Sequence, residues 1–364
     1  MTSTDGEAVA GLRGRKVLVT GASGFIGRRL VAALCASGAE VTALVRSRHG
    51  LTAFDGQPVR PVLASLADAD KLPAAVAGQE VIFSLAYDVR APAQTNLDGF
   101  ANLVRTAEAE GKARIVHASS IVVYDGWPDG PVSEATPMDK PGGGPYRQAK
   151  IAEERQLMGG SLAAAILQPT IVWGPGSSLW TDGLAEALLA GAVLLPQPEG
   201  LCQGVFVDDV VQACLKAAVL PDLGRERFIV NGPAPFAWSA LLSGYAGLLG
   251  RGEVRFRPAA ELAPPADAGP KGDAPQKPPL AARISAAGRT ILGRDRFEAL
   301  LRHVRRHLKQ GGEMRPDPHL FQLFTASGAC PPDLARARLG YRPAFDLQEG
   351  LAATADHLRR LAGG

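Results

Sequence analysis

The chain has 364 residues, of which 46% are hydrophobic and 21% charged, with a formal net charge of +3 at pH 7. This length suits two domains, or one large domain with a lobe, and it can bury a core without disulfides or metals. The small net charge excludes a chain that binds nucleic acid over its whole surface. The four cysteines form no C-x-x-C pair, which argues against a zinc site or a disulfide scaffold and fits a reducing cytoplasm.

Short β-branched runs alternate with helical stretches through the first half of the chain. The N-terminal stretch lacks the apolar core of a secretory signal, and we expect residues 1–14 to form a disordered tail. We find no run long enough to span a membrane. The predicted strands are 16–20, 40–45, 59–63, 80–85, 114–118 and 162–167, and the predicted helices are 25–37, 68–76, 96–109 and 146–158. This alternation predicts an α/β fold, a Rossmann-like doubly wound parallel sheet.

The alternation breaks after residue 176. Strands 205–207 and 227–230 flank a predicted helix over 209–219, and a helical tail covers 334–361 with a turn at 340–343. We therefore expect a dinucleotide-binding domain over 15–176, to which 205–232 returns, and a smaller C-terminal α+β substrate lobe formed by 177–204 and 233–364. The seven prolines within 257–280 predict a long surface loop rather than a packed element.

Most of the positive charge lies in one segment. Residues 283–309 carry eight Lys and Arg against Asp295 and Glu298, so this segment has +6 and the rest of the chain has −3. Its apolar residues fall at helical spacing, with basic residues on the other face. One interpretation is a helix that covers the lobe; the alternative is docking to an anionic membrane or a diphosphate-bearing substrate. His303 and His307 lack a third ligand in sequence, so no metal site is expected.

The segment Thr20 to Gly27 reads T-G-A-S-G-F-I-G and lies between a predicted strand and a predicted helix. Gly21 permits the tight turn, Gly24 lets the backbone approach a pyrophosphate, and Gly27 lets helix and strand pack closely. A glycine triad alone often marks only a turn, but one placed directly after a strand predicts a dinucleotide site. The cofactor contacts expected from this turn are Gly21, Ser23, Gly24, Phe25, Ile26 and Gly27.

Arg46 follows the second predicted strand. An Asp or Glu at this position would hold a ribose 2′-hydroxyl, whereas a guanidinium offers donors that suit a 2′-phosphate. We therefore expect NADP in preference to NAD. The alternative interpretation leaves Arg46 and Arg48 as solvated loop charges.

Tyr146 and Lys150 lie four residues apart in a predicted helix, so their side chains share a face. The reference pKa of tyrosine is about 10, and a nearby ammonium favours the phenolate, which would let Tyr146 exchange a proton with a carbonyl oxygen. Taken alone, Y-x-x-x-K is common and describes many surface pairs. Ser119 and Ser120 follow the predicted strand 114–118, where a hydroxyl would polarise the reacting oxygen, although such serines more often form a turn or cap.

Together these motifs resemble those of the extended short-chain dehydrogenase/reductases, in the branch that includes NAD-dependent epimerases and dehydratases. The resemblance runs from Val17 to about Leu358. It rests on T-G-A-S-G-F-I-G at 20–27, Leu85-Ala86, S-S-x-x-V-Y at 119–124, Y-x-x-x-K at 146–150, L-x-P-x-x-V-x-G-P at 167–175 and V-D-D-V at 207–210. It implies a catalytic triad of Ser120, Tyr146 and Lys150, in which Tyr146 is the acid/base and Lys150 lowers its pKa and binds the ribose.

The resemblance also implies further contacts and an oligomeric state. The adenosine of the cofactor would contact Leu66, Leu85 and Ala86, and the nicotinamide would contact Pro169, Ile171 and Val172. The substrate would contact Tyr87, Tyr124 and Trp173. A homodimer would form through the helices near 97–109 and 146–158.

Departures from the family pattern bear on the substrate. Ile121 and Val122 stand where the dehydratases place Asp-Glu, which argues against water elimination. Gln168 stands where sugar-nucleotide epimerases often carry Arg, and the stretch 202–206 also lacks Arg. We expect hydride transfer at a secondary alcohol or ketone of a sugar, nucleotide sugar or sugar conjugate. The alternatives are a ketoreductase for a hydrophobic ketone, similar to dihydroflavonol reductases and 3β-hydroxysteroid dehydrogenases, and a non-catalytic dinucleotide-binding sensor.

Overall fold

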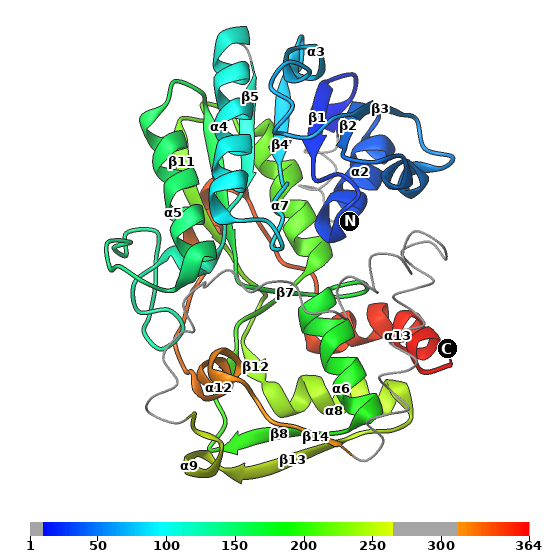
Figure 1. Cartoon of the computed structure of the whole chain (residues 1–364), viewed down its shortest axis with the longest axis vertical. Coiled ribbons are helices and arrows are strands. Elements are labelled where there is room, and N and C mark those ends of the chain that lie inside the picture. The colour runs from blue at the N-terminus through cyan, green and yellow to red at the C-terminus, as the bar shows by residue number, and fades with distance from the viewer. Residues whose placement is uncertain (1–9, 112, 265–311, 364) are drawn as a thin grey trace. The chain divides into compact units, whose positions relative to one another are not determined.

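The computed structural model describes residues 10–111, 113–264 and 312–363, and contacts divide them into two compact units (Figure 1). The first unit contains the described residues of Met1–Trp173, Gln203–Pro235 and Gly328–Asp346, and the second those of Gly174–Cys202, Phe236–Ser327 and Leu347–Gly364. The chain thus returns to the first unit at Gln203. Residues 328–346, which we expected in the lobe, cluster with the first unit instead.

A seven-stranded sheet with the order β11-β6-β5-β4-β1-β2-β3 lies at the centre of the first unit. Its strands are β1 (Lys16–Thr20), β2 (Glu40–Val45), β3 (Val59–Leu63), β4 (Val81–Ser84), β5 (Arg114–Ala118), β6 (Ala164–Pro169) and β11 (Arg225–Val230). Every pairing in this sheet is parallel. The predicted α/β, Rossmann-like sheet is therefore confirmed.

Helices cover both faces of the sheet (Figure 1). One layer contains α2 (Phe25–Ser37) and α7 (Val207–Val219), and the other contains α3 (Leu72–Val76), α4 (Ala93–Glu110) and α5 (Gly144–Gly159). In β1, Val17 packs into the cluster that includes Leu30 of α2, whereas Leu18 packs into the cluster that includes Leu103 of α4. Because successive side chains of a strand point to opposite faces, one continuous apolar run fills both layers.

Shorter elements complete the first unit. They are η1 (Arg48–Phe54), η2 (Ile121–Val123), η4 (Ala335–Leu339), and the parallel pair β7 (Ile171–Trp173) and β10 (Gly204–Phe206).

The second unit contains a three-stranded parallel sheet of order β13-β8-β14 and an antiparallel pair, β9 with β12. Its strands are β8 (Gly191–Gln197), β9 (Leu201–Cys202), β12 (Phe236–Ala237), β13 (Glu253–Pro258) and β14 (Gly312–Met314). Its helices are η3 (Ser178–Gly183), α6 (Leu184–Ala190), α8 (Trp238–Leu249), α9 (Ala259–Leu262), α12 (Pro318–Thr325) and α13 (Leu347–Gly363). In this unit Trp238 is fully buried, and its ring centroid lies 4.8 Å from that of Phe324.

Three predicted boundaries are wrong. Leu12 is fully buried in the core, so residues 10–14 do not belong to a disordered tail. The predicted proline-rich loop cannot start at 257, because Pro258 ends β13, where a residue without an N–H is tolerated, and α9 follows it. The helix predicted over 68–76 starts at Leu72 rather than at 68, because the Asp68 carboxylate accepts the N–H of Ser65 in a turn. The basic segment 283–309 lies outside the described residues.

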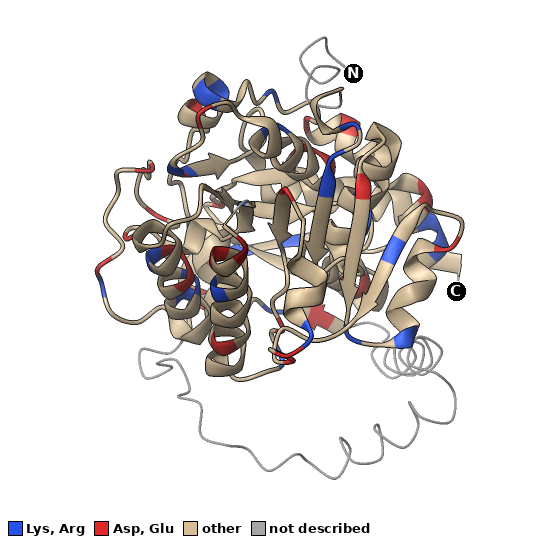
Figure 2. Ribbon diagram, turned by 90° about the horizontal axis from the view of Figure 1, so that it is seen from above, with Lys and Arg blue, Asp and Glu red and all other residues tan. Residues whose placement is uncertain are grey.

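Basic and acidic residues are interspersed along the described ribbon (Figure 2). Within the described ranges, no helix is both long and apolar enough to cross a membrane. In the same ranges, no group of three or more His, Cys, Asp or Glu is placed to hold a metal ion.

Candidate active site

The turn between β1 and α2 leaves no room for a side chain at two of its glycines. Gly21 has φ of +65°, and a Cβ there would lie 2.8 Å from the amide nitrogen of Ala86. A Cβ at Gly27 would overlap the carbonyl oxygen of Gly21. The helix α2 starts with Gly24 as its N-cap and no side chain caps it, so its first N–H groups can meet a phosphate.

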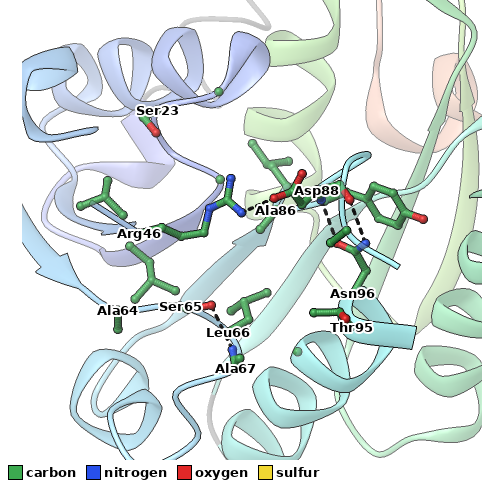
Figure 3. A pocket seen from close by; sticks show the side chains of 18 residues that line it. Ser23, Arg46, Ala64, Ser65, Leu66, Ala67, Ala86, Asp88, Thr95 and Asn96 are labelled. Carbon is green, nitrogen blue, oxygen red and sulfur yellow. Dashed lines mark hydrogen bonds and ion pairs between the residues drawn. The ribbon is translucent and has the colours of Figure 1, made fainter. Parts of the chain in front are cut away.

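A pocket of about 360 Å³ opens at the carboxyl ends of β1, β2, β3 and β4 (Figure 3). This edge of a parallel α/β sheet is where such folds bind ligands. Of the residues predicted to contact cofactor or substrate, those that line the pocket are Gly21, Ser23, Gly24, Arg46, Leu66, Leu85, Ala86 and Tyr87. The glycine turn and the open pocket beside it fit a dinucleotide.

Other predicted cofactor contacts lie outside this pocket. Phe25, Ile26 and Gly27 form the first turn of α2, and Pro169 ends β6. Ile171 and Val172 lie in β7, where Ile171 is buried.

Arg46 extends across the pocket to Asp88, a residue that we did not predict (Figure 3). The distance from Nη1 of Arg46 to Oδ2 of Asp88 is 2.5 Å. Hydrogen bonds from Arg46 and from the N–H of Arg90 hold the pKa of Asp88 below its usual value. The sequence signal for this pair was an acidic residue four positions after the end of β4, at the same edge of the sheet as the end of β2, which Arg46 follows.

Tyr146 and Lys150 both lie on α5, but their environments differ. Tyr146 is 39% exposed, whereas Lys150 is buried and donates to the carbonyl of Ala118 at 2.9 Å. Tyr87 lies between them: its ring centroid is 4.8 Å from Nζ of Lys150 and 5.0 Å from the ring centroid of Tyr146. The structure therefore brings Tyr146 and Lys150 together around Tyr87, which also lines the pocket.

Lys150 belongs to a buried ionic cluster. Its Nζ donates to Oε2 of Glu153 at 2.8 Å, and this oxygen lies 3.3 Å from Nε2 of His117. Burial raises the pKa of Glu153, but the contact with His117 and the charge of Lys150 outweigh this effect and leave the pKa below its usual value. We did not predict a role for Glu153 from the sequence, although its position three residues after Lys150 places both side chains on one helix face.

We expect the stability of the protein to fall as the pH drops below about 6.5, because burial lowers the pKa of His117. The unfolded chain takes up a proton on this imidazole at the ordinary pKa, while the folded protein does so only at lower pH. Below about 6.5 the unfolded state binds more protons, so the free energy of unfolding decreases by up to about 1.4 kcal/mol per pH unit.

Urea denaturation of the wild type and of His117→Gln between pH 5 and 7.5 measures this dependence. The variant should lose less stability on acidification than the wild type. Replacement of the exposed His319 by Gln controls for the loss of a histidine. Parallel curves for wild type and His117→Gln would contradict the expectation.

The two serines after β5 are not equivalent. Ser119 is buried and donates to Oε1 of Glu154 at 2.5 Å. Glu154 also accepts hydrogen bonds from Gln168 at 2.9 Å and from Arg227 at 2.6 Å. The hydroxyl of Ser119 is therefore part of a buried hydrogen-bond network. Ser120 is half-buried and only caps η2, where its Oγ accepts the Val122 N–H at 3.4 Å. Its hydroxyl is therefore the better placed of the two to serve a reacting oxygen.

Two of the three predicted substrate contacts lie in the interior of the first unit. The hydroxyl of Tyr124 donates to Oε1 of Gln168 at 2.6 Å, and burial raises the pKa of this tyrosine. Trp173 is buried and packs edge-on against Phe206, with ring centroids 5.2 Å apart. Only Tyr87 of the three both lines the pocket and contacts Tyr146.

Comparisons with known proteins agree with this geometry. A family model described as NAD(P)H-binding matches residues 21–173. The chain is 34% identical over 271 residues to a 3-diazoavenalumate denitrifying reductase from a Streptomyces species, covering 68% of this chain and 86% of the relative. It is 32% identical over 274 residues to a UDP-glucose 4-epimerase from Mycolicibacterium smegmatis, covering 67% and 86%.

Among solved structures, the epimerase Mth375 from Methanothermobacter thermautotrophicus aligns with a TM-score of 0.71 at 17% identity, over 98% of this chain and 96% of that one. Fold, pocket and family match together define an enzyme that uses a nicotinamide dinucleotide. The chain belongs to the extended short-chain dehydrogenase/reductase family, among its NAD(P)-dependent oxidoreductases and epimerases.

Proposed function

We propose that the protein is an NADP(H)-dependent oxidoreductase that transfers hydride at a secondary alcohol or ketone, with Tyr146 as the proton donor and acceptor. The observation that carries this proposal is the position of Tyr87. This residue lines the dinucleotide pocket and also contacts the exposed ring of Tyr146, so the pocket and the acid/base meet in one unit.

Arg46 supports NADP over NAD. It lines the pocket directly after β2, where NAD-specific folds carry an acidic residue for the ribose 2′-hydroxyl. Its side chain is 65% exposed, and a guanidinium can bind a phosphate through two donors.

The proposed chemistry divides between cofactor and chain. When bound, the nicotinamide supplies or accepts the hydride. Tyr146 gives its phenolic proton to the carbonyl oxygen during reduction and takes it back during oxidation. The ammonium of Lys150 favours the phenolate that reduction leaves, and Ser120 donates a hydrogen bond to the same oxygen.

For the substrate, we propose a ketone without a nucleotide diphosphate. Gln168 occupies the position where sugar-nucleotide epimerases often carry Arg, and its side chain is fully buried between Tyr124 and Glu154. Residues 202–206 carry no Arg, and Val205 and Phe206 pack in the core. A second candidate, a sugar conjugate, is favoured by the similarity to a UDP-glucose 4-epimerase.

A panel assay separates these functions. The purified protein is incubated with NADPH or NADH and with alkyl ketones, aromatic ketones or UDP-glucose. We expect ketone-dependent oxidation of NADPH that is faster than that of NADH. Epimerisation of UDP-glucose without net change in the dinucleotide would support the second candidate instead, and a protein that binds neither dinucleotide would overturn both.

A further inference from the structure

The guanidinium of Arg46 already has an anionic partner inside the dinucleotide pocket. Its Nη1 lies 2.5 Å from Oδ2 of Asp88, and both residues line the pocket (Figure 3). Arg46 reaches from the end of β2 and Asp88 follows the end of β4, with β1 between these strands. A 2′-phosphate that binds Arg46 must therefore replace a carboxylate rather than meet an unpaired cation.

Asp88 is held in place independently of Arg46. The side-chain amide of Asn96 accepts the N–H of Asp88 at 2.7 Å and donates to the carbonyl of Asp88 at 3.0 Å. The second carboxylate oxygen, Oδ1, accepts the N–H of Arg90 at 3.0 Å. Because these contacts do not involve Arg46, the carboxylate stays at the pocket wall when the guanidinium turns toward another anion.

Each of the two charges of the pocket has a counter-ion in contact only while the Arg46–Asp88 pair is intact. Among the described residues that line the pocket, Arg46 and Asp88 are the charged ones. A 2′-phosphate gains the guanidinium but faces the released carboxylate, and like charges at short range repel each other. A ribose 2′-hydroxyl is uncharged, so NADH has no comparable reason to break the pair.

We propose that Asp88 is a specificity-determining residue that competes with the 2′-phosphate for Arg46 and so limits the preference for NADPH over NADH. This inference rests on the proposed role of Arg46 in NADP binding. It assigns the balance between the two cofactors to a residue outside the glycine turn and outside the strand that carries Arg46.

The nearly isosteric Asp88→Asn tests the proposal by removing the charge. An exposed ion pair contributes up to about 1 kcal/mol, so we expect the Kd for NADPH to fall about fivefold and the Kd for NADH to change by less than about twofold. Both Kd values are measured by fluorescence titration at low ionic strength. Raising the salt concentration should shrink the gain for NADPH, since screening weakens exposed charges. Asp98→Asn, an exposed site on α4 outside the pocket, is the matched control.

A double-mutant cycle with Arg46→Gln locates the effect. If Asp88 acts by competing for Arg46, Asp88→Asn should improve NADPH binding clearly less in the Arg46→Gln background. An unchanged Kd for NADPH in Asp88→Asn, an equal change for NADPH and NADH, or the same gain without Arg46 would each overturn the proposal. If Arg46→Gln alone leaves the Kd for NADPH unchanged, the proposed function of Arg46 fails, which is a separate result.

Discussion

Replacing Tyr146 with Phe is expected to lower kcat for ketone reduction by about 10²–10⁴-fold, because the variant has no phenolic proton to give to the carbonyl oxygen. The Kd for NADPH should stay within about twofold of the wild type. The ring of Tyr146 meets Tyr87 edge-on, and Phe preserves that contact, so the fold around α5 is retained. Steady-state NADPH oxidation and a fluorescence titration measure the two quantities.

Tyr87→Phe is the matched control for this prediction. It removes a second phenol from the same site but keeps the ring over Nζ of Lys150. Burial and the nearby Glu153 raise the pKa of Tyr87, which makes it a poor source of protons at neutral pH. Tyr87 lines the pocket, so its variant can change substrate binding, but we expect its kcat to fall far less than that of Tyr146→Phe, because its phenol does not move the proton. A kcat for Tyr146→Phe equal to that of the wild type would show that another group moves the proton.

Replacing Glu153 with Leu is expected to destabilise the protein by about 3–5 kcal/mol, because the ammonium of Lys150 would remain buried without its carboxylate partner. Both side chains are at most 4% exposed, so water cannot easily take the place of Glu153. Urea denaturation at pH 7.5 measures the loss. Glu153→Gln, which keeps an acceptor for Lys150, should lose less.

A double variant distinguishes a lost partner from a simple packing defect. Lys150→Met combined with Glu153→Leu removes both charges, and apolar replacement of a whole buried pair often costs little stability. We expect the double variant to be more stable than Glu153→Leu alone, although it lacks Lys150 and should be inactive. A double variant that is less stable than the single one would show that the ion pair is not the source of the loss.

The fold could be predicted because its signals are local. The apolar run Lys16–Thr20, the glycine turn after it and the helical spacing of Phe25–Ser37 each specify their own structure, and together they define a βαβ fold. The second unit was harder to predict. Its strand β8 and helix α8 are both largely apolar and short, and a short apolar run does not reveal its period. Leu12 stands between Gly11 and Arg13, in no apolar run long enough to show a period.

The parts of the site that lie within one segment of the chain could be predicted. The parts that depend on the order of the strands in the sheet could not. The glycine turn, Arg46 and the Tyr146–Lys150 pair each lie within a single motif. The partner of Arg46 is 42 residues away, and only the placement of β1 between β2 and β4 brings Asp88 to the same pocket. Likewise, the contact between Glu153 and His117 depends on how α5 packs against β5, which neither segment shows by itself.

The central claim is hydride transfer from NADPH to a ketone. It is tested most directly by incubating the wild-type protein with NADPH that carries deuterium at both C4 positions and with the ketone selected by the panel. The predicted result is an alcohol with one deuterium on the carbinol carbon, formed in equal amount to the NADPH oxidised. An alcohol without deuterium, or NADPH oxidation that does not depend on any ketone, would contradict the account.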